Sequence, residues 1–80
     1  MNEIEAGDIL RIKRSYGTNG QHEHFWGRVG QLVRVTHVET SRFQTLLLVP
    51  EPGQHGNDGY NDGQGWSNDM GELNSRFEKL

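Results

Sequence analysis

The sequence predicts a small all-β domain in which about five short antiparallel strands curl into a barrel, with residues 1–80 forming a single domain. Three observations support this prediction. The chain has 80 residues, near the lower limit for a self-sufficient core, and only 31% of them are apolar. Its 11 glycines indicate frequent turns. After a glycine turn, Val29, Val33 and Val35 share one parity, so their side chains leave the same face of a strand.

Residues 27–38 form the predicted central strand, around which the other elements are arranged. Gly30 either takes backbone angles closed to other residues or marks a bulge that bends the strand. His37 lies on the parity of Val33 and Val35, which predicts a partly buried core histidine rather than a catalyst.

Residues 9–14 predict a half-buried strand that precedes the central one. Leu10 and Ile12 fall on one parity of this segment. Arg11 and Lys13 fall on the other parity, which is the alternation expected when one face of a strand is buried.

Residues 15–26 predict a long hairpin loop that leads back into the central strand. Asn19-Gly20 is the commonest pair in type I′ turns and predicts a tight reversal within this loop. The loop carries three aromatic residues, namely Tyr16, Phe25 and Trp26.

Residues 43–49 predict the next strand, after a short polar hairpin turn at residues 39–42. The apolar run over residues 46–49 is too brief for a stable isolated helix, so a strand covered on both faces is the better interpretation. Pro50 ends this strand because proline lacks the N–H that a ladder requires.

Residues 50–72 predict a long loop rich in Gly, Asn and Asp, without helical or strand periodicity. A loop of this length in so small a domain is either functional or disordered. Tyr60 and Trp66 favour partial order, because one buried aromatic side chain contributes roughly a few kcal/mol. Leu73 and Phe77 share a strand parity and are also four residues apart, which predicts a closing strand, with a last helical turn as the alternative.

Charge and composition narrow the functional classes. The net charge of −3 argues against a generic nucleic-acid binder. The charge is uneven, and this indicates either an interaction face or ordinary surface pairing. Six of the eight basic residues lie within residues 9–42, namely Arg11, Lys13, Arg14, Arg28, Arg34 and Arg42.

The absence of cysteine excludes disulfides and thiolate zinc sites. Without a signal-like start or a long apolar run, we expect a soluble, cytoplasmic protein with no membrane partner.

The aromatic residues are the most informative candidates for binding. Gathered at one edge of a barrel, they would form a stacking or proline-binding platform. The alternative is that these tryptophans cap the open ends of a barrel that is poor in core residues, which is the favoured interpretation for Trp66, whereas for Trp26 the two interpretations weigh evenly. Tyr16 and Tyr60 are better candidates for the surface. The predicted aromatic set is Tyr16, Phe25, Trp26, Tyr60 and Trp66.

Basic residues near these aromatics would suit a nucleic-acid backbone with stacked bases. The alternative is a solvated outer face of the sheet, on which alternating charges are expected in any case. The predicted basic set is Arg11, Lys13, Arg14, Arg28 and Arg34.

Two segments, residues 22–24 and residues 58–69, contain residue types that commonly bind metal ions. His22 and His24 lie on one side of an extended segment, and His37 or His55 would have to supply a third ligand for zinc. Nothing in the sequence ties that third ligand to the pair, so a solvated loop is the favoured explanation of the two histidines.

Residues 58–69 partly imitate an EF-hand calcium loop, with Asp58 at the first position and Asp62 at the fifth. Tyr60 stands where an acid or amide is needed, Asp69 replaces the bidentate glutamate, and no flanking amphipathic helices are predicted. A turn rich in Asn, Asp and Gly explains the same residues, so no metal or cofactor is predicted.

Residues 7–12 and 27–35 together resemble the first half of SH3-like small β-barrels. The most similar are the KOW-type modules of ribosomal and transcription-elongation proteins, and small barrels of phage and mobile-element proteins and of a photosystem I peripheral subunit share the arrangement. The resemblance covers residues 7–49, whereas residues 50–72 depart from it because these barrels normally connect those strands by shorter turns. It implies a binding module rather than an enzyme, because KOW-type barrels engage RNA or its machinery and other SH3-like barrels bind proteins.

We therefore expect a non-enzymatic module that docks onto a protein partner or a larger assembly through residues 15–26 and 50–71. A phage or mobile-element accessory protein is a compatible setting. The alternative is direct RNA or DNA binding by the basic strand face. An exposed strand edge beside a small core is compatible with either a monomer or a homodimer.

Overall fold

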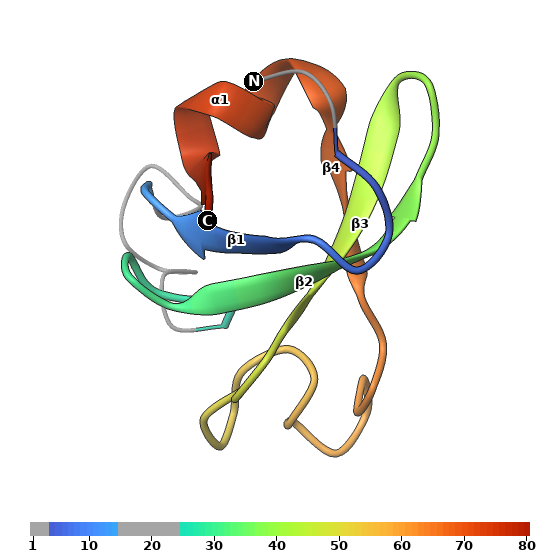
Figure 1. Cartoon of the computed structure of the whole chain (residues 1–80). Helices are drawn as coiled ribbons and strands as arrows, with labels where there is room; N and C mark the ends of the chain where they lie inside the picture. The colour runs from blue at the N-terminus through green and yellow to red at the C-terminus, as the bar shows by residue number, and fades with distance from the viewer. Residues whose placement is uncertain (1–3, 15–24) are drawn as a thin grey trace.

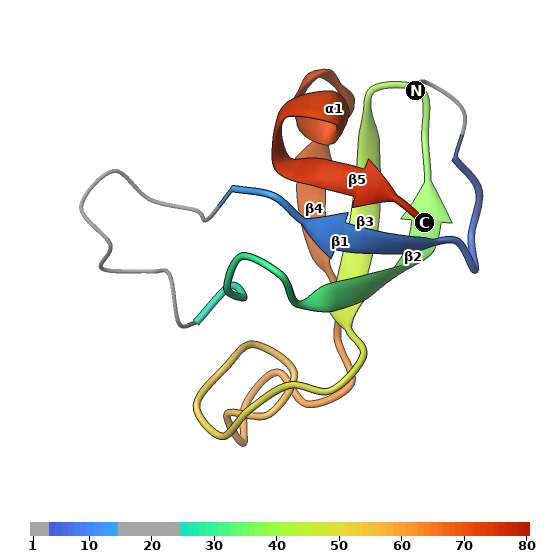
Figure 2. The ribbon, with the colours of Figure 1, turned by 60° about the vertical axis from the view of Figure 1, so that its left-hand side comes forward.

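The computed structural model describes residues 4–14 and 25–80. In this part of the chain, five antiparallel strands form one sheet in the order β4-β3-β2-β1-β5. The sheet curls around its own core, as Figures 1 and 2 show from two directions. The predicted mostly β domain of about five short antiparallel strands is confirmed. The elements are β1 (Ile9–Ile12), β2 (Leu32–Val38), β3 (Arg42–Leu47), β4 (Trp66–Asp69), a 3₁₀ turn η1 (Met70–Glu72), α1 (Leu73–Arg76) and β5 (Phe77–Lys79).

The core occupies the inner face of the curled sheet. In β1, Leu10 and Ile12 are buried while Arg11 between them is exposed, as the alternation predicts. The rings of Phe43 and Phe77 meet edge to face with centroids 5.7 Å apart and join β3 to β5 across the core. The complete core cluster is Leu10, Ile12, Val33, Val35, Phe43, Leu47, Trp66, Leu73 and Phe77.

The central strand begins later than the sequence predicts. β2 starts at Leu32, and Val29, expected on its buried face, precedes the strand and is 60% exposed. Gly27 and Gly30 both have positive φ, and the Gly30 N–H donates to the Ile12 carbonyl at 2.8 Å. The two glycines therefore form a turn that precedes β2 in the chain, and Val29 lies within this turn and not within the strand.

A bulge within β2 changes the face of His37. The register with β3 shifts between Val35 and His37, so one extra residue, Thr36, lies opposite the partner strand. Because side chains alternate at every position, this extra residue moves His37 from the buried to the exposed face. The prediction of a partly buried core histidine was wrong.

β3 is buried on one face only, contrary to the prediction of a strand covered on both faces. Phe43, Thr45 and Leu47 are buried, whereas Leu48 and Val49 lie beyond the strand end and are exposed. The reason is that none of the described helices and strands packs over the outer face of the sheet (Figure 2).

The predicted loop over residues 50–72 is shorter in the structure, because β4 and η1 occupy its last part. β4 alternates between buried and exposed residues, and Asn68 occupies a buried position where its amide donates to the Thr45 hydroxyl at 3.1 Å. A buried asparagine breaks the apolar alternation that marks a strand in sequence. In the tail, a helical turn and a strand occur in succession, since α1 supplies one helical turn that contains Leu73, and β5, which begins at Phe77, pairs with β1 as an edge strand of the sheet.

No helix in residues 4–14 or 25–80 is long and apolar enough to cross a membrane.

Candidate binding site

Four rings gather where the loop after β3 meets the turn before β2. We call Phe25, Trp26, His55 and Trp66 the aromatic cluster. The Trp26 ring stacks on His55 with centroids 5.0 Å apart, and Phe25 meets Trp26 edge to face at 4.8 Å. Trp66 lies 5.7 Å from Trp26 and 5.5 Å from His55. Offset and edge-to-face pairs of this kind add packing energy beyond the apolar area that they bury.

Burial within the aromatic cluster differs between its members. Trp66 is a buried core residue, and Trp26 is half-buried and packs against the core. Phe25 is also half-buried, so the outer side of the cluster reaches the surface. Of the five predicted aromatic residues, the structure brings Phe25, Trp26 and Trp66 together. Tyr60 is exposed elsewhere on the loop, and Tyr16 lies outside the described residues.

His55 is buried, and neither of its ring nitrogens has a hydrogen-bond partner in the described part of the chain. Its imidazole therefore packs as one more ring of the aromatic cluster. Residues 4–14 and 25–80 contain no group of three or more His, Cys, Asp or Glu side chains that could hold a metal ion. His22 and His24 lie outside the described residues, as does the predicted Asn19-Gly20 turn.

A pair of glutamines fastens the loop after β3 to the turn before β2. The Gln54 amide donates to Gln31 Oε1 at 2.8 Å, and the Gln31 amide donates to Gln54 Oε1 at 3.1 Å. Each of these oxygens also accepts a backbone N–H, from Arg28 at Gln31 and from Glu51 at Gln54, at 2.7 Å in both cases. Because Gln54 is fully buried, this satisfied network is worth more than the same bonds in water.

The backbone makes a second attachment, since the His55 N–H donates to the Phe25 carbonyl at 2.7 Å. Glutamine in a polar loop gives no signal in sequence that it will be buried. For this reason Gln31 and Gln54 were not predicted as structural residues of the site.

Tyr60 lies further along the same loop and is 90% exposed. The Asp58 carboxylate accepts the backbone N–H of Tyr60 at 3.0 Å and that of Asn61 at 2.7 Å. The Asp62 carboxylate accepts the Gly59 N–H at 2.9 Å. Two of the three carboxylates in the calcium-like segment over residues 58–69 therefore bond to the turn's own backbone, which is the behaviour of Asp in an Asn/Asp/Gly turn, and the third, Asp69, pairs with Arg42.

The charge on Asp58 is stabilised by these bonds. The Asn61 backbone N–H is the main cause that holds the pKa of Asp58 below its ordinary value, and the Asn61 side-chain amide adds to it. A similar case is Asp8, where the backbone N–H of Glu5 and then the ammonium group of Lys79 lower the pKa.

The predicted basic residues come from β1, from β2 and from the segments beside these strands, and Arg11 and Arg34 share the outer face of the sheet. Arg11 pairs with Glu78 across β1 and β5 at 2.9 Å. Arg34 lies in the middle of β2, Arg28 in the turn before it, and Arg14 two residues beyond β1.

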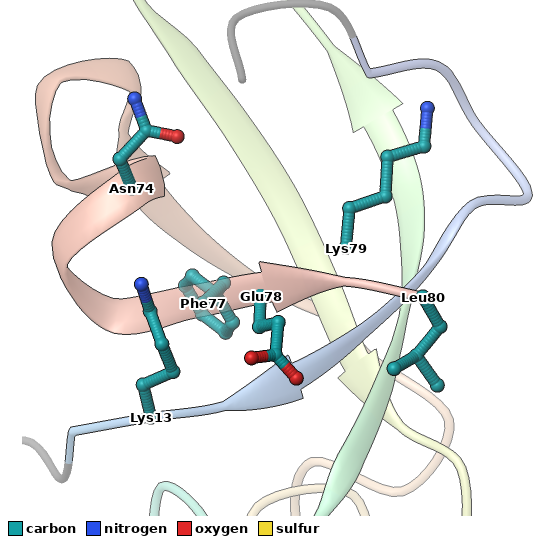
Figure 3. Close-up of a pocket in the computed structure, with 6 residues that line it drawn as sticks. All are labelled: Lys13, Asn74, Phe77, Glu78, Lys79 and Leu80. Atoms are coloured by element: carbon teal, nitrogen blue, oxygen red, sulfur yellow. The ribbon is translucent and has the colours of Figure 1, made fainter.

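A separate groove of about 510 Å³ lies along β5 (Figure 3). It contains none of the predicted aromatic residues. Its one acidic side chain, Glu78, is the partner of Arg11, so no unpaired carboxylate is directed into it. Its lining residues are Lys13, Asn74, Phe77, Glu78, Lys79 and Leu80.

Comparisons with protein-family models, with curated proteins and with solved structures found no match to this chain. The class of protein is therefore the one that the structure itself defines, a small and mostly β domain with one curled five-stranded sheet.

Proposed function

We propose that this chain is a non-enzymatic binding module that docks onto a protein partner through the loop over residues 50–65 and the adjoining aromatic cluster. The observation that carries the proposal is Tyr60, a large aromatic side chain that is 90% exposed on a loop fastened by buried and charged hydrogen bonds. Tyrosine is enriched among the residues that dominate protein interfaces. A loop that is already ordered loses little conformational entropy when it binds.

The resemblance to SH3-like small barrels supports the same proposal, because those barrels are mostly binding modules. Fold similarity alone does not assign a function, and the weight of the proposal therefore rests on the loop. A cytoplasmic location belongs to the same proposal.

Protein is favoured over nucleic acid as the partner. The chain carries a net charge of −3, Arg11 is paired with Glu78, and Arg14, Arg28 and Arg34 belong to three different segments: the one after β1, the turn before β2, and β2 itself. A nucleic-acid backbone is bound by several cations along one track.

The test is a pull-down from cell lysate with tagged wild-type protein and two variants, with and without nuclease, read by mass spectrometry. We expect Tyr60→Ala to weaken retention of a specific protein by roughly 30-fold, the loss typical of an interface hot spot. The control is Glu39→Ala, which changes an exposed residue in the β2–β3 turn, at the far end of the sheet from the loop (Figure 2).

A partner that both variants retain equally would contradict the proposed role of Tyr60. Loss of all specific partners after nuclease treatment would instead indicate a nucleic-acid binder. Direct binding of that kind weakens steeply as salt is raised.

A further inference from the structure

The outer face of the sheet, opposite the core, carries paired charges at both of its edges. On the β1–β5 side, Arg11 and Glu78 form an ion pair at 2.9 Å. On the β3–β4 side, Arg42 donates to Ser67 at 2.7 Å and to Asp69 at 2.9 Å. At both edges the arginines therefore already have partners.

Between these two edges lies a different surface. Arg34 is directly opposite Ile9 on β1 and Leu46 on β3 in the strand register. Leu32 is on the same face two residues earlier, and its carbonyl accepts the Leu48 N–H at 3.1 Å. We call this surface the Arg34 patch, which consists of Ile9, Leu32, Arg34, Leu46, Leu48 and Val49.

The Arg34 patch is largely apolar, and it is hollowed at the end that contains Leu32, Leu48 and Val49. Leu32, Leu48 and Val49, together with Gln31, line a hollow of about 230 Å³. Leu48 is 43% exposed and Val49 is 81% exposed. At the other side, a β-carbon on Gly56 would lie 3.3 Å from Leu46 Cδ1, so the loop after β3 borders the patch. Contiguous exposed aliphatic groups on a small domain are typical of an interaction surface.

Arg34 is the one charged residue among these six, and Arg11, which lies opposite Leu32 on the same face, is already paired with Glu78. No ion pair joins it to a carboxylate in residues 4–14 or 25–80. A guanidinium surrounded by aliphatic groups attracts a carboxylate strongly once a partner excludes water, because the local dielectric constant falls.

We propose that the Arg34 patch is a second docking surface, separate from the Tyr60 loop, and that it binds a segment of another protein in which Asp or Glu lies among aliphatic side chains. The acid pairs with Arg34, and the aliphatic groups fill the hollow beside Leu48. This arrangement places charge complementarity at the centre and apolar contact around it.

The charge of Arg34 argues against two other occupants. A second copy docked symmetrically with the two-fold axis beside Arg34 would bring two Arg34 side chains together, which is repulsive. Nucleic acid would require further cations and stacking rings, whereas the residues directly opposite Arg34 are aliphatic and the nearby Arg11 is paired with Glu78.

The experiment selects peptides from a displayed random library on the full chain, and then maps the binding of the synthetic peptides by NMR. We expect the enriched peptides to contain Asp or Glu beside Leu, Ile or Val and to shift the amides of Ile9, Arg34 and Leu46. Arg34→Ala should weaken binding by about tenfold or more. Arg34→Glu should reverse the preference towards Lys-bearing versions of the same peptides.

Two controls keep the result interpretable. Arg14→Ala removes an exposed arginine outside the patch and should leave peptide binding unchanged. Leu48→Ser removes aliphatic surface while keeping Arg34, and should weaken binding as well. Arg34 is exposed, so thermal melting of its variants should match the wild type.

The proposal would be overturned by an absence of peptides that shift these amides, or by acid-free peptides that bind wild type and Arg34→Ala equally. It would also be overturned if single-stranded DNA, or the protein itself at high concentration, shifted the same amides while the peptides did not. Because Tyr60→Ala leaves the Arg34 patch intact, failure of the proposed loop site and failure of this one are distinguishable.

Discussion

At the scale of single residues, Gly27 allows the backbone next to Trp26 to lie against the core residues Ile12 and Leu47. Its φ is +107°, and a β-carbon there would lie 2.7 Å from Ile12 Cδ1 and 3.0 Å from Leu47 Cδ2. Any side chain would therefore combine backbone strain with a clash against two core residues. Only glycine allows the chain to pass this close to the core immediately after Trp26.

We predict that Gly27→Ala lowers the free energy of unfolding by roughly 2–4 kcal/mol, the sum of the strain and the overpacking. Urea denaturation measures this change. The matched control is Gly59→Ala, since Gly59 also has positive φ (+85°) but has nothing within 4 Å of the added carbon. It should cost only about 1–2 kcal/mol. Equal losses in the two variants would show that the contacts with Ile12 and Leu47 relax freely.

The sequence predicts residue positions well where strict alternation decides them, as in β1. It fails at His37, because a bulge of one residue reverses the face of everything that follows and leaves no mark in the hydrophobic pattern. It also fails at Gln54 and His55, which are buried through partners distant in sequence. Such burial depends on tertiary contacts and not on local periodicity.

At the scale of elements, the turn around Tyr60 depends on an ionised carboxylate. The pKa of Asp58 is lowered from the ordinary value of 3.8, chiefly by the backbone N–H of Asn61. A folded-state pKa below the unfolded value means that the ionised form stabilises the turn at pH above 3.8. This contribution is lost as the pH falls through the lower, folded-state value.

We therefore predict that the backbone amides of Tyr60 and Asn61 keep their chemical shifts from neutral pH down to the ordinary carboxyl range, and change only under stronger acid. An NMR pH titration measures this directly. In Asp58→Asn the same amides should show no acid transition of their own. If the transition in the wild-type protein were centred above pH 3.8, the carboxylate would not be held by these bonds.

The β4 strand shows why the sequence predicts a longer loop than the structure contains. Its four residues, Trp66–Asp69, contain one apolar side chain, and they follow a segment rich in glycine. The strand forms because β3 offers a free edge, and because Asn68 finds the Thr45 hydroxyl inside the core. Strand propensity is easily overridden by such context.

At the scale of the whole molecule, the two proposed surfaces depend on one small core. Trp66 belongs both to that core and to the aromatic cluster, where it contacts Trp26 and His55. An 80-residue domain has a total stability of roughly 4–12 kcal/mol. Loss of one large buried side chain is therefore a considerable part of the total.

We predict that Trp66→Ala lowers the free energy of unfolding by about 3–5 kcal/mol and strongly lowers the melting temperature. Circular dichroism during heating measures both. Tyr60→Ala removes an exposed ring and should stay within about 0.5 kcal/mol of the wild type. A Trp66→Ala variant that melted like the wild type would mean that the aromatic cluster lies apart from the cooperative core. In that case the loop that presents Tyr60 would be held by its hydrogen bonds to the turn before β2, namely the glutamine pair and the His55–Phe25 backbone bond, and Gln54→Ala would then loosen the loop without unfolding the sheet.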